Sequence, residues 1–161
     1  MELYFLRHAR AMKREEWTGP DERRPLTAKG AALMQREAVA LAKLDLRLDL
    51  IVTSPLERAR HTAEITAKAL GMKKRVVQST ALAPGFSVQK LARFLASRPK
   101  VSRVMFVGHE PDFSQVLSEL TGGGRIICRK GCFARVDIAG TTFSRGSGRL
   151  IWLLQPEVLA K

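Results

Sequence analysis

Short apolar segments and helix-patterned segments alternate along most of this chain, and this alternation constrains the fold more than any other feature. The apolar segments have the length of buried β-strands, and the segments between them carry apolar residues at helical spacing. The predicted strands are 2–7, 48–54, 74–79, 102–109, 132–139 and 148–155, and the predicted helices are 26–44, 54–71, 87–97 and 111–122. The last two strands have no helical pattern between them, which indicates an antiparallel hairpin.

Strands that alternate with helices predict a mostly parallel sheet, because parallel neighbours need crossover connections that bring helices onto both faces. We therefore expect a three-layer α/β/α sandwich whose C-terminal strands are antiparallel. End signals support the second helix: Ser54 is a predicted N-cap, Pro55 a predicted first helical residue, and Gly71 a predicted stop. Thr27 is the predicted cap of the first helix.

The length of 161 residues suits one globular domain over 1–161, long enough to bury a core. The first apolar segment ends at Leu6 and lacks the basic start and long apolar run of a signal peptide. No later apolar run has membrane-spanning length, so we expect a soluble cytoplasmic protein without membrane contact. Cys128 and Cys132 lack a second ligand pair, which favours reduced thiols over a metal site.

The formal net charge of +13 predicts an anionic partner. Nucleic acid is one candidate, but no aromatic residues are interleaved with the basic ones as a base-stacking platform would require. A phosphorylated protein or a small phosphorylated molecule remains as the other class of partner.

Polar residues gather where the predicted strands end. Arg7 and His8 lie at the carboxyl end of the first strand, Ser54 ends the second strand and Arg58 lies one turn into the helix after it, and His109 ends the strand over 102–109. Ligands of such sheets bind beyond the carboxyl ends of the strands. Guanidinium groups match phosphate oxygens, and an imidazole can act as base, metal ligand or nucleophile. Each residue alone has an ordinary structural explanation, but together they indicate a phosphoryl site.

These residues lie in segments that resemble a known family. "LRHA" (6–9), "TSPLERARHTA" (53–63) and "VGHEP" (107–111) resemble the signatures of the histidine phosphatase superfamily, with its phosphoglycerate mutase-like fold, and "RPLTAKG" (24–30) is an auxiliary match. The small size resembles the SixA-type phosphohistidine phosphatase branch.

The resemblance implies a role for each matching residue. It makes His8 the nucleophile that becomes phosphohistidine, Arg7 and Arg58 phosphate clamps, and His109 a further phosphate-binding group. Ser54 is an expected substrate-binding residue of the same motif. Such a nucleophile must be neutral, so we expect the other ring nitrogen of His8 to donate to a backbone carbonyl.

The sequence departs from the family pattern at two places. Arg10 follows an R-H-A sequence in place of the usual R-H-G, which adds a cation near the predicted site and makes Arg10 a further candidate for substrate binding.

His61, the remaining histidine of the chain, lies three residues after Arg58 and is expected on the surface.

The second departure concerns the acid that protonates the leaving group. Mutase and sugar-phosphatase members carry a glutamate after the third strand, whereas 79–89 contains no carboxylate here. Possible replacements are Asp21, Glu22, Glu110 and Asp112. An imidazole leaving group can be protonated before its P–N bond breaks, so a missing acid favours a phosphohistidine substrate over a phosphate ester.

The sequence therefore predicts a metal-independent and cofactor-independent phosphatase that forms a covalent phosphohistidine and acts on phosphohistidine in a protein. Two alternatives stay open: a phosphatase of small metabolites such as sugar phosphates, and a noncatalytic module that binds phosphate or nucleic acid.

Overall fold

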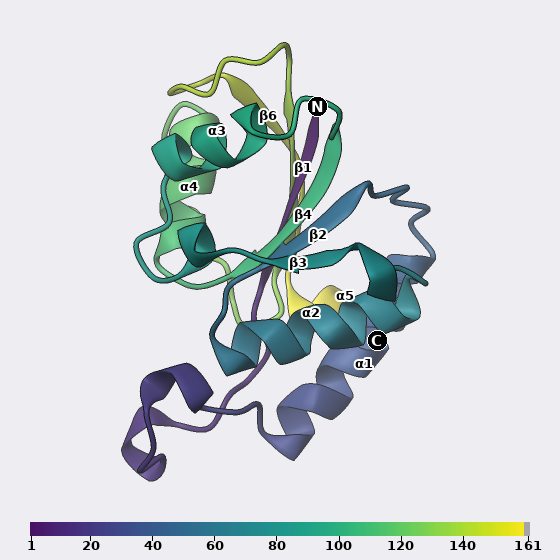
Figure 1. Cartoon of the computed structure of the whole chain (residues 1–161), viewed down its shortest axis with the longest axis vertical. Coiled ribbons are helices and arrows are strands. Elements are labelled where there is room, and N and C mark those ends of the chain that lie inside the picture. The colour runs from purple at the N-terminus through teal and green to yellow at the C-terminus, as the bar shows by residue number, and fades with distance from the viewer. Residues whose placement is uncertain (160–161) are drawn as a thin grey trace.

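One six-stranded sheet runs through the computed structural model, which describes residues 1–159 (Figure 1). Its strands are β1 (Glu2–Arg7), β2 (Leu50–Thr53), β3 (Val76–Gln78), β4 (Arg103–Gly108), β5 (Phe133–Ile138) and β6 (Gly148–Leu154). The spatial order is β3-β2-β4-β1-β5-β6. The first four strands pair in parallel, whereas β5 is antiparallel to β1 and β6 is antiparallel to β5. The predicted mixed sheet with a C-terminal hairpin is confirmed.

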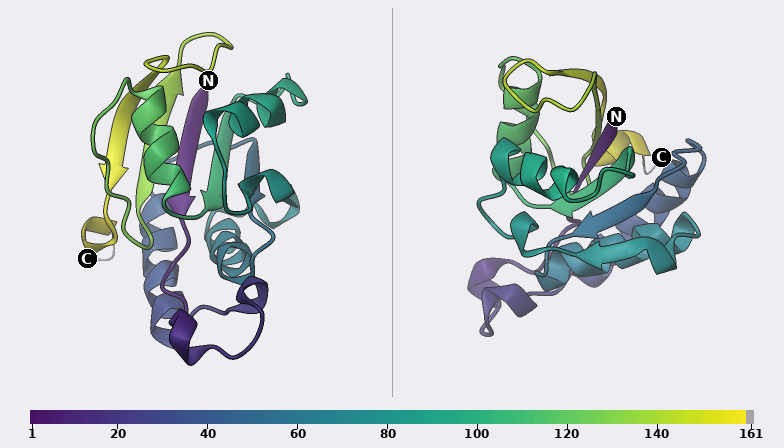
Figure 2. Two further views of the ribbon diagram at one scale, coloured as in Figure 1. Left: turned by 90° about the vertical axis from the view of Figure 1, so that its left-hand side faces the viewer. Right: turned by 45° about the horizontal axis from the view of Figure 1, so that its top comes forward.

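Helices cover both faces of this sheet and complete three layers (Figures 1 and 2). On one face lie α1 (Ala28–Ala42), α2 (Glu57–Ala69) and the short α5 (Pro156–Leu159); on the other lie α3 (Val88–Ala96) and α4 (Asp112–Leu120). No helix among residues 1–159 is long and apolar enough to cross a membrane.

The central strands are apolar on both sides because they separate two cores. In β1, Leu3 and Phe5 pack into the core under α3 and α4, whereas Tyr4 and Leu6 pack into the core under α1 and α2. Successive side chains of a strand point to opposite faces, so a continuous apolar run is what a doubly covered strand requires. Leu3 and Leu6 are completely buried.

The predicted start of the second helix is wrong. We expected Ser54 as N-cap, but α2 begins at Glu57, because Ser54 still donates its backbone N–H to Val107 of β4 and so belongs to the end of the sheet. The predicted stop is confirmed, since Gly71 follows the helix with φ of +68°, a conformation that suits glycine. Thr27 caps α1 by accepting a hydrogen bond from the Gly30 N–H.

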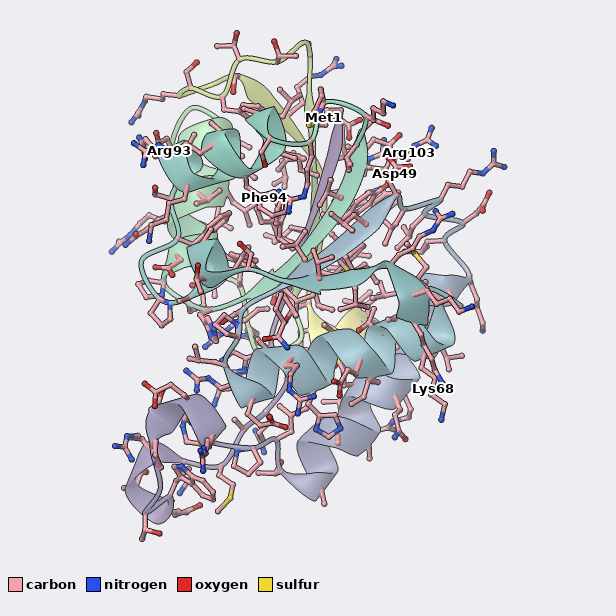
Figure 3. The ribbon with its side chains drawn as sticks, in the orientation of Figure 1. Met1, Asp49, Lys68, Arg93, Phe94 and Arg103 are labelled. Carbon is pink, nitrogen blue, oxygen red and sulfur yellow. The ribbon has the colours of Figure 1, made fainter. Side chains whose placement is uncertain are left out.

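The two ends of the sheet differ in character. Figure 3 shows Asp49 beside Arg103 where β2 and β4 begin, and Asp49 accepts hydrogen bonds there from the backbone of Ser102 and Arg103. At the opposite end, the segment after β1 extends well beyond the sheet before α1 begins (Figure 2). This segment contains two short 3-10 helices, Arg14–Glu16 and Asp21–Arg23, which the sequence analysis did not predict.

Candidate active site

The two histidines that follow β1 and β4 meet at one edge of the sheet. The register places Arg7 opposite Gly108, so the next residue of each strand, His8 and His109, emerges at the same level. The two rings have centroids 5.3 Å apart, and both side chains are buried. The predicted convergence of these two histidines is therefore present in the fold.

The backbone fixes which nitrogen of His8 is free. The Nδ1 atom lies 2.7 Å from the carbonyl oxygen of Ala9. A carbonyl can only accept, so Nδ1 carries the hydrogen and Nε2 keeps its lone pair. Burial is the main reason that the pKa of His8 lies well below 6.5; the positive charges of Arg58 and Arg7, and that of His109 when it is protonated, lower it further, whereas the hydrogen bond to Ala9 raises it. The ring is therefore neutral near neutral pH.

Thr62 holds the segment that carries His8. Its hydroxyl accepts a 3.0 Å hydrogen bond from the Ala9 N–H and donates a 2.7 Å bond to the Arg58 carbonyl, so it links the loop after β1 to α2. Thr62 is completely buried. Sequence reasoning missed this residue, although its position one turn after Arg58 on the buried face of a helix is a signal that could have found it.

His109 is held by Ser54, and one of its nitrogens is free. The His109 Nε2 and the Ser54 Oγ are 2.8 Å apart, while His109 Nδ1 is buried without a hydrogen-bond partner. Burial lowers the pKa of His109 to about 4, and the charge of Arg58 contributes. Ser54 therefore lies at the predicted site, where it orients a histidine rather than capping a helix.

Both predicted phosphate clamps reach the same edge of the sheet. Arg7 donates from Nη1 to the Cys128 carbonyl at 2.7 Å, and Arg58 donates from Nη1 to the Asp21 carbonyl at 2.9 Å. The Arg58 Nη2 also pairs with the Asp21 carboxylate at 3.0 Å. In both arginines the Nε atom is buried and has no partner.

Buried donors without partners are rare, because each one costs free energy. Among residues 1–159, four buried side-chain polar atoms have no hydrogen-bond partner, and three of them are Arg7 Nε, Arg58 Nε and His109 Nδ1. Buried nitrogen donors that lack partners and lie together at one edge of a sheet are suited to bind an oxyanion, because an oxyanion accepts several hydrogen bonds at once.

The four carboxylates considered as acids have other partners or lie exposed. Asp112 accepts hydrogen bonds from the backbone of Gly85 and Phe86 and so holds 79–89 against α4. Glu110 accepts from the backbone and the hydroxyl of Ser114. Glu22 is exposed.

Asp21 is the one of these carboxylates that reaches the candidate site. Burial opposes its ionisation, but hydrogen bonds and charge from Arg24 and Arg58 prevail and lower its pKa. It is therefore a charged partner of Arg58 and not a carboxylic acid that holds a proton.

Two other predicted residues lie elsewhere. Arg10 is exposed and lines a neighbouring cavity with Lys29, on the α1 side of the His8 segment. His61 points away from the site, since it lines a separate hollow along α2 with Arg60 and Glu64.

Cys128 and Cys132 are free thiols buried in the core, and the Cys128 carbonyl accepts the hydrogen bond from Arg7 described above. Within residues 1–159 there is no group of three or more His, Cys, Asp or Glu side chains that could hold a metal ion.

Known proteins are similar to this chain in sequence and in fold. The model of the histidine phosphatase superfamily (branch 1) matches residues 3–83, half of the chain. An uncharacterized protein of Picosynechococcus sp. is 41% identical over 118 residues, which cover 71% of this chain and 70% of that protein.

Solved structures extend the likeness to nearly the whole chain. The protein histidine phosphatase SixA complexed with tungstate superposes with a TM-score of 0.84 at 23% identity over 97% of both chains, which shows a common fold. A protein from Agrobacterium tumefaciens assigned to the SixA phosphohistidine phosphatases is 26% identical, with a TM-score of 0.76 over 96% of this chain and 97% of that one.

The same fold also occurs in phosphatases of small metabolites. A mycobacterial glucosyl-3-phosphoglycerate phosphatase has a TM-score of 0.70 at 18% identity, over 94% of this chain and 96% of that one. With its sequence motifs, its phosphoglycerate mutase-like sheet and these relatives, the chain belongs to the histidine phosphatase superfamily, and within it to the SixA-type branch.

Proposed function

We propose that this phosphatase works through a covalent phosphohistidine on His8, without a metal ion, and that its substrate is a phosphorylated histidine of a protein. The observation that carries the proposal is the free Nε2 of His8, which lies in a buried site together with three unpaired nitrogen donors of Arg7, Arg58 and His109.

The first step transfers the phosphoryl group to the enzyme. The lone pair of His8 Nε2 attacks phosphorus, and the bond from phosphorus to the leaving nitrogen breaks with its electron pair on that nitrogen. Arg7 and Arg58 offset the negative charge of the phosphoryl oxygens, which is the main contribution that a protein makes to this reaction. In the second step water attacks the phosphohistidine and releases inorganic phosphate and neutral His8.

His109 serves this proposal as a neutral hydrogen-bond donor. When the Ser54 hydroxyl donates to Nε2, the ring hydrogen lies on Nδ1, the atom without a protein partner. A phosphoryl oxygen is then the acceptor for that hydrogen.

The substrate class follows from the leaving group. Asp21 is engaged by arginines, Asp112 and Glu110 hold backbone groups, and 79–89 offers no carboxylate. A phosphate ester needs a positioned acid for its alkoxide, whereas the imidazole of phosphohistidine can take its proton from water before it leaves. The protein histidine phosphatase SixA has the same fold, which agrees with this substrate.

A phosphatase of small metabolites is the second candidate, because a glucosyl-3-phosphoglycerate phosphatase shares the fold. A noncatalytic phosphate-binding or nucleic-acid-binding module is the third, and the net charge of +13 is what favours it. A cytoplasmic location stays a prediction of the sequence.

Two measurements separate these candidates. The first is hydrolysis of p-nitrophenyl phosphate in the presence of a chelator by the wild type and by His8→Ala; activity that resists the chelator and is lost in the variant supports the covalent mechanism. Activity that persists in His8→Ala removes His8 from the reaction, and inactivity of the wild type on every phosphorylated compound favours the binding module. The second is turnover of a phosphohistidine-bearing domain against that of sugar phosphates, where a strong preference for the sugars contradicts the proposed substrate.

A further inference from the structure

We propose that the cavity on the α1 side of the His8 segment is a second anion subsite, which holds another negatively charged group of the same substrate next to the phosphoryl group. The cavity has a volume of about 480 Å³, which is within the range of small-molecule sites. It lies between the loop after β1, the start of α1, the loop before β5 and α5.

The charged residues around this cavity are mostly basic. Its charged lining residues are five cations and two acids: Arg7, Arg10, Lys29, Arg129, Lys130, Glu37 and Glu157. The two acids do not neutralise the five cations, so the cavity attracts anions.

Four of these cations, Arg7 among them, have no acidic partner within the described part of the chain. Arg129 pairs with Glu157 at 2.8 Å, but no ion pair joins Arg10, Lys29 or Lys130 to a carboxylate. Burial lowers the pKa of the Lys130 ammonium, and the positive charges of Arg7, Arg10 and Arg24 lower it further. Cations that repel one another in this way are stabilised by an anion placed between them.

A buried carboxyl group also lines the cavity. Glu37 is only 1% exposed, its Oε2 has no hydrogen-bond partner, and it packs against Gly131, where an added Cβ would come within 2.5 Å of that oxygen. Burial raises the pKa of Glu37 to about 7, Glu157 contributes, and Arg36 opposes. A protonated Glu37 leaves the cavity cationic and supplies a hydrogen for an anionic oxygen.

The cavity adjoins the candidate active site through the His8 segment. Arg7 and Ala9, the neighbours of His8 on either side, both line it. A substrate whose phosphoryl group lies at His8 can therefore place a second anionic group against Arg10, Lys29 and Lys130. The identity of this second anionic group depends on the substrate and so rests on the proposed function. In a phosphorylated protein, the group is a carboxylate that flanks the phosphohistidine. In a metabolite, the group is a second phosphate.

The test uses probes with one or several linked phosphates. Titration calorimetry gives the Kd of orthophosphate, which carries a single phosphate, and of tripolyphosphate, whose linked phosphates supply anionic groups to both sites. We expect the variant Lys29→Ala/Lys130→Ala to raise the Kd of tripolyphosphate at least about tenfold, because two charge-assisted contacts are lost, and to leave the Kd of orthophosphate within about twofold.

The matched control is Lys68→Ala/Lys100→Ala, which removes the same charge from two exposed positions outside the cavity; Figure 3 shows Lys68 on α2. The control variant should keep the wild-type ratio between the Kd of tripolyphosphate and the Kd of orthophosphate. An equal rise for both ligands, or no rise for tripolyphosphate, overturns the subsite. Calorimetry needs no turnover, so this result is independent of whether the proposed reaction occurs.

A second arm identifies the source of the anionic group. Phosphohistidine peptides with acidic or with neutral flanking residues are compared by kcat/KM in the wild type and in Lys29→Ala/Lys130→Ala. A preference for acidic flanks that disappears in the variant supports a protein carboxylate. Equal kcat/KM values, together with the selective effect on tripolyphosphate, support a second phosphate of a metabolite.

Discussion

The Thr62 hydroxyl accepts the backbone N–H of Ala9 at 3.0 Å, which ties the residue after His8 to α2. We expect Thr62→Val to lower kcat for p-nitrophenyl phosphate roughly tenfold or more, because the valine keeps the shape but leaves the Ala9 N–H without a partner. An unsatisfied buried donor costs about 1–3 kcal/mol, and the loop will move to relieve it.

Thr62→Ser is the control, since it keeps the hydroxyl and removes only a methyl group. It should recover most of the lost kcat. If valine and serine variants have the same kcat, the hydroxyl does not position His8.

The second prediction concerns Arg58, which is buried and whose Nε has no hydrogen-bond partner. Arg58→Ala should lower kcat/KM by about 10²–10³, the effect of losing one preorganised donor to a transition-state oxyanion. Arg60→Ala is the matched control on the same helix, because Arg60 pairs with Glu57 and Glu64 on the outer face. Equal losses in the two variants would mean that the effect comes from α2 and not from a phosphate clamp.

The third prediction is a pH profile. An ordinary histidine is half protonated at pH 6.5, but burial and neighbouring cations hold the pKa of His8 well below that value. The nucleophile therefore stays neutral as the pH falls through 6.5. We expect kcat/KM, corrected for ionisation of the substrate, to be level through pH 6.5 and to fall only at distinctly lower pH. A decline centred at 6.5 would contradict a buried, neutral His8.

The fourth prediction concerns the stability of the fold. The pKa of Glu37 is about 7 in the folded protein against an ordinary 4.5, so between these values the folded state binds more protons than the unfolded chain. The contribution of Glu37 to the free energy of unfolding should therefore fall by about 3 kcal/mol as the pH rises from 4.5 to 7 and stay level above, while the lowered pKa values of His8 and His109 act in the opposite direction in the wild type and in Glu37→Gln alike. Glu37→Gln has no carboxyl to ionise and should lack this decline.

Urea unfolding of the wild type and Glu37→Gln across this range measures the difference between the two. Parallel curves for the two proteins would show that Glu37 ionises with an ordinary pKa.

The sequence predicted the architecture because its signals are local. Strand length, helical spacing and the stop at Gly71 depend on neighbouring residues, and the strand ends then place His8 and His109 together. Contacts between distant segments gave no such signal. The link from Thr62 to Ala9 spans 53 residues, and the contact of Arg58 with Asp21 spans 37.

Ser54 shows how a local signal can mislead. Ser-Pro before a helical pattern is typical of a helix start, but the strand pairing of β2 with β4 extends to the Ser54 backbone and delays α2 to Glu57. Only the fold shows that the Ser54 hydroxyl is engaged by His109.

The central claim is that His8 accepts the phosphoryl group, and the most direct measurement is mass spectrometry of enzyme quenched rapidly in alkali during turnover, where a phosphoramidate survives. The mechanism predicts one added phosphoryl group on the peptide that contains His8, absent from His8→Ala. A turning-over enzyme with no such adduct, or with the phosphoryl group on His109, would contradict it.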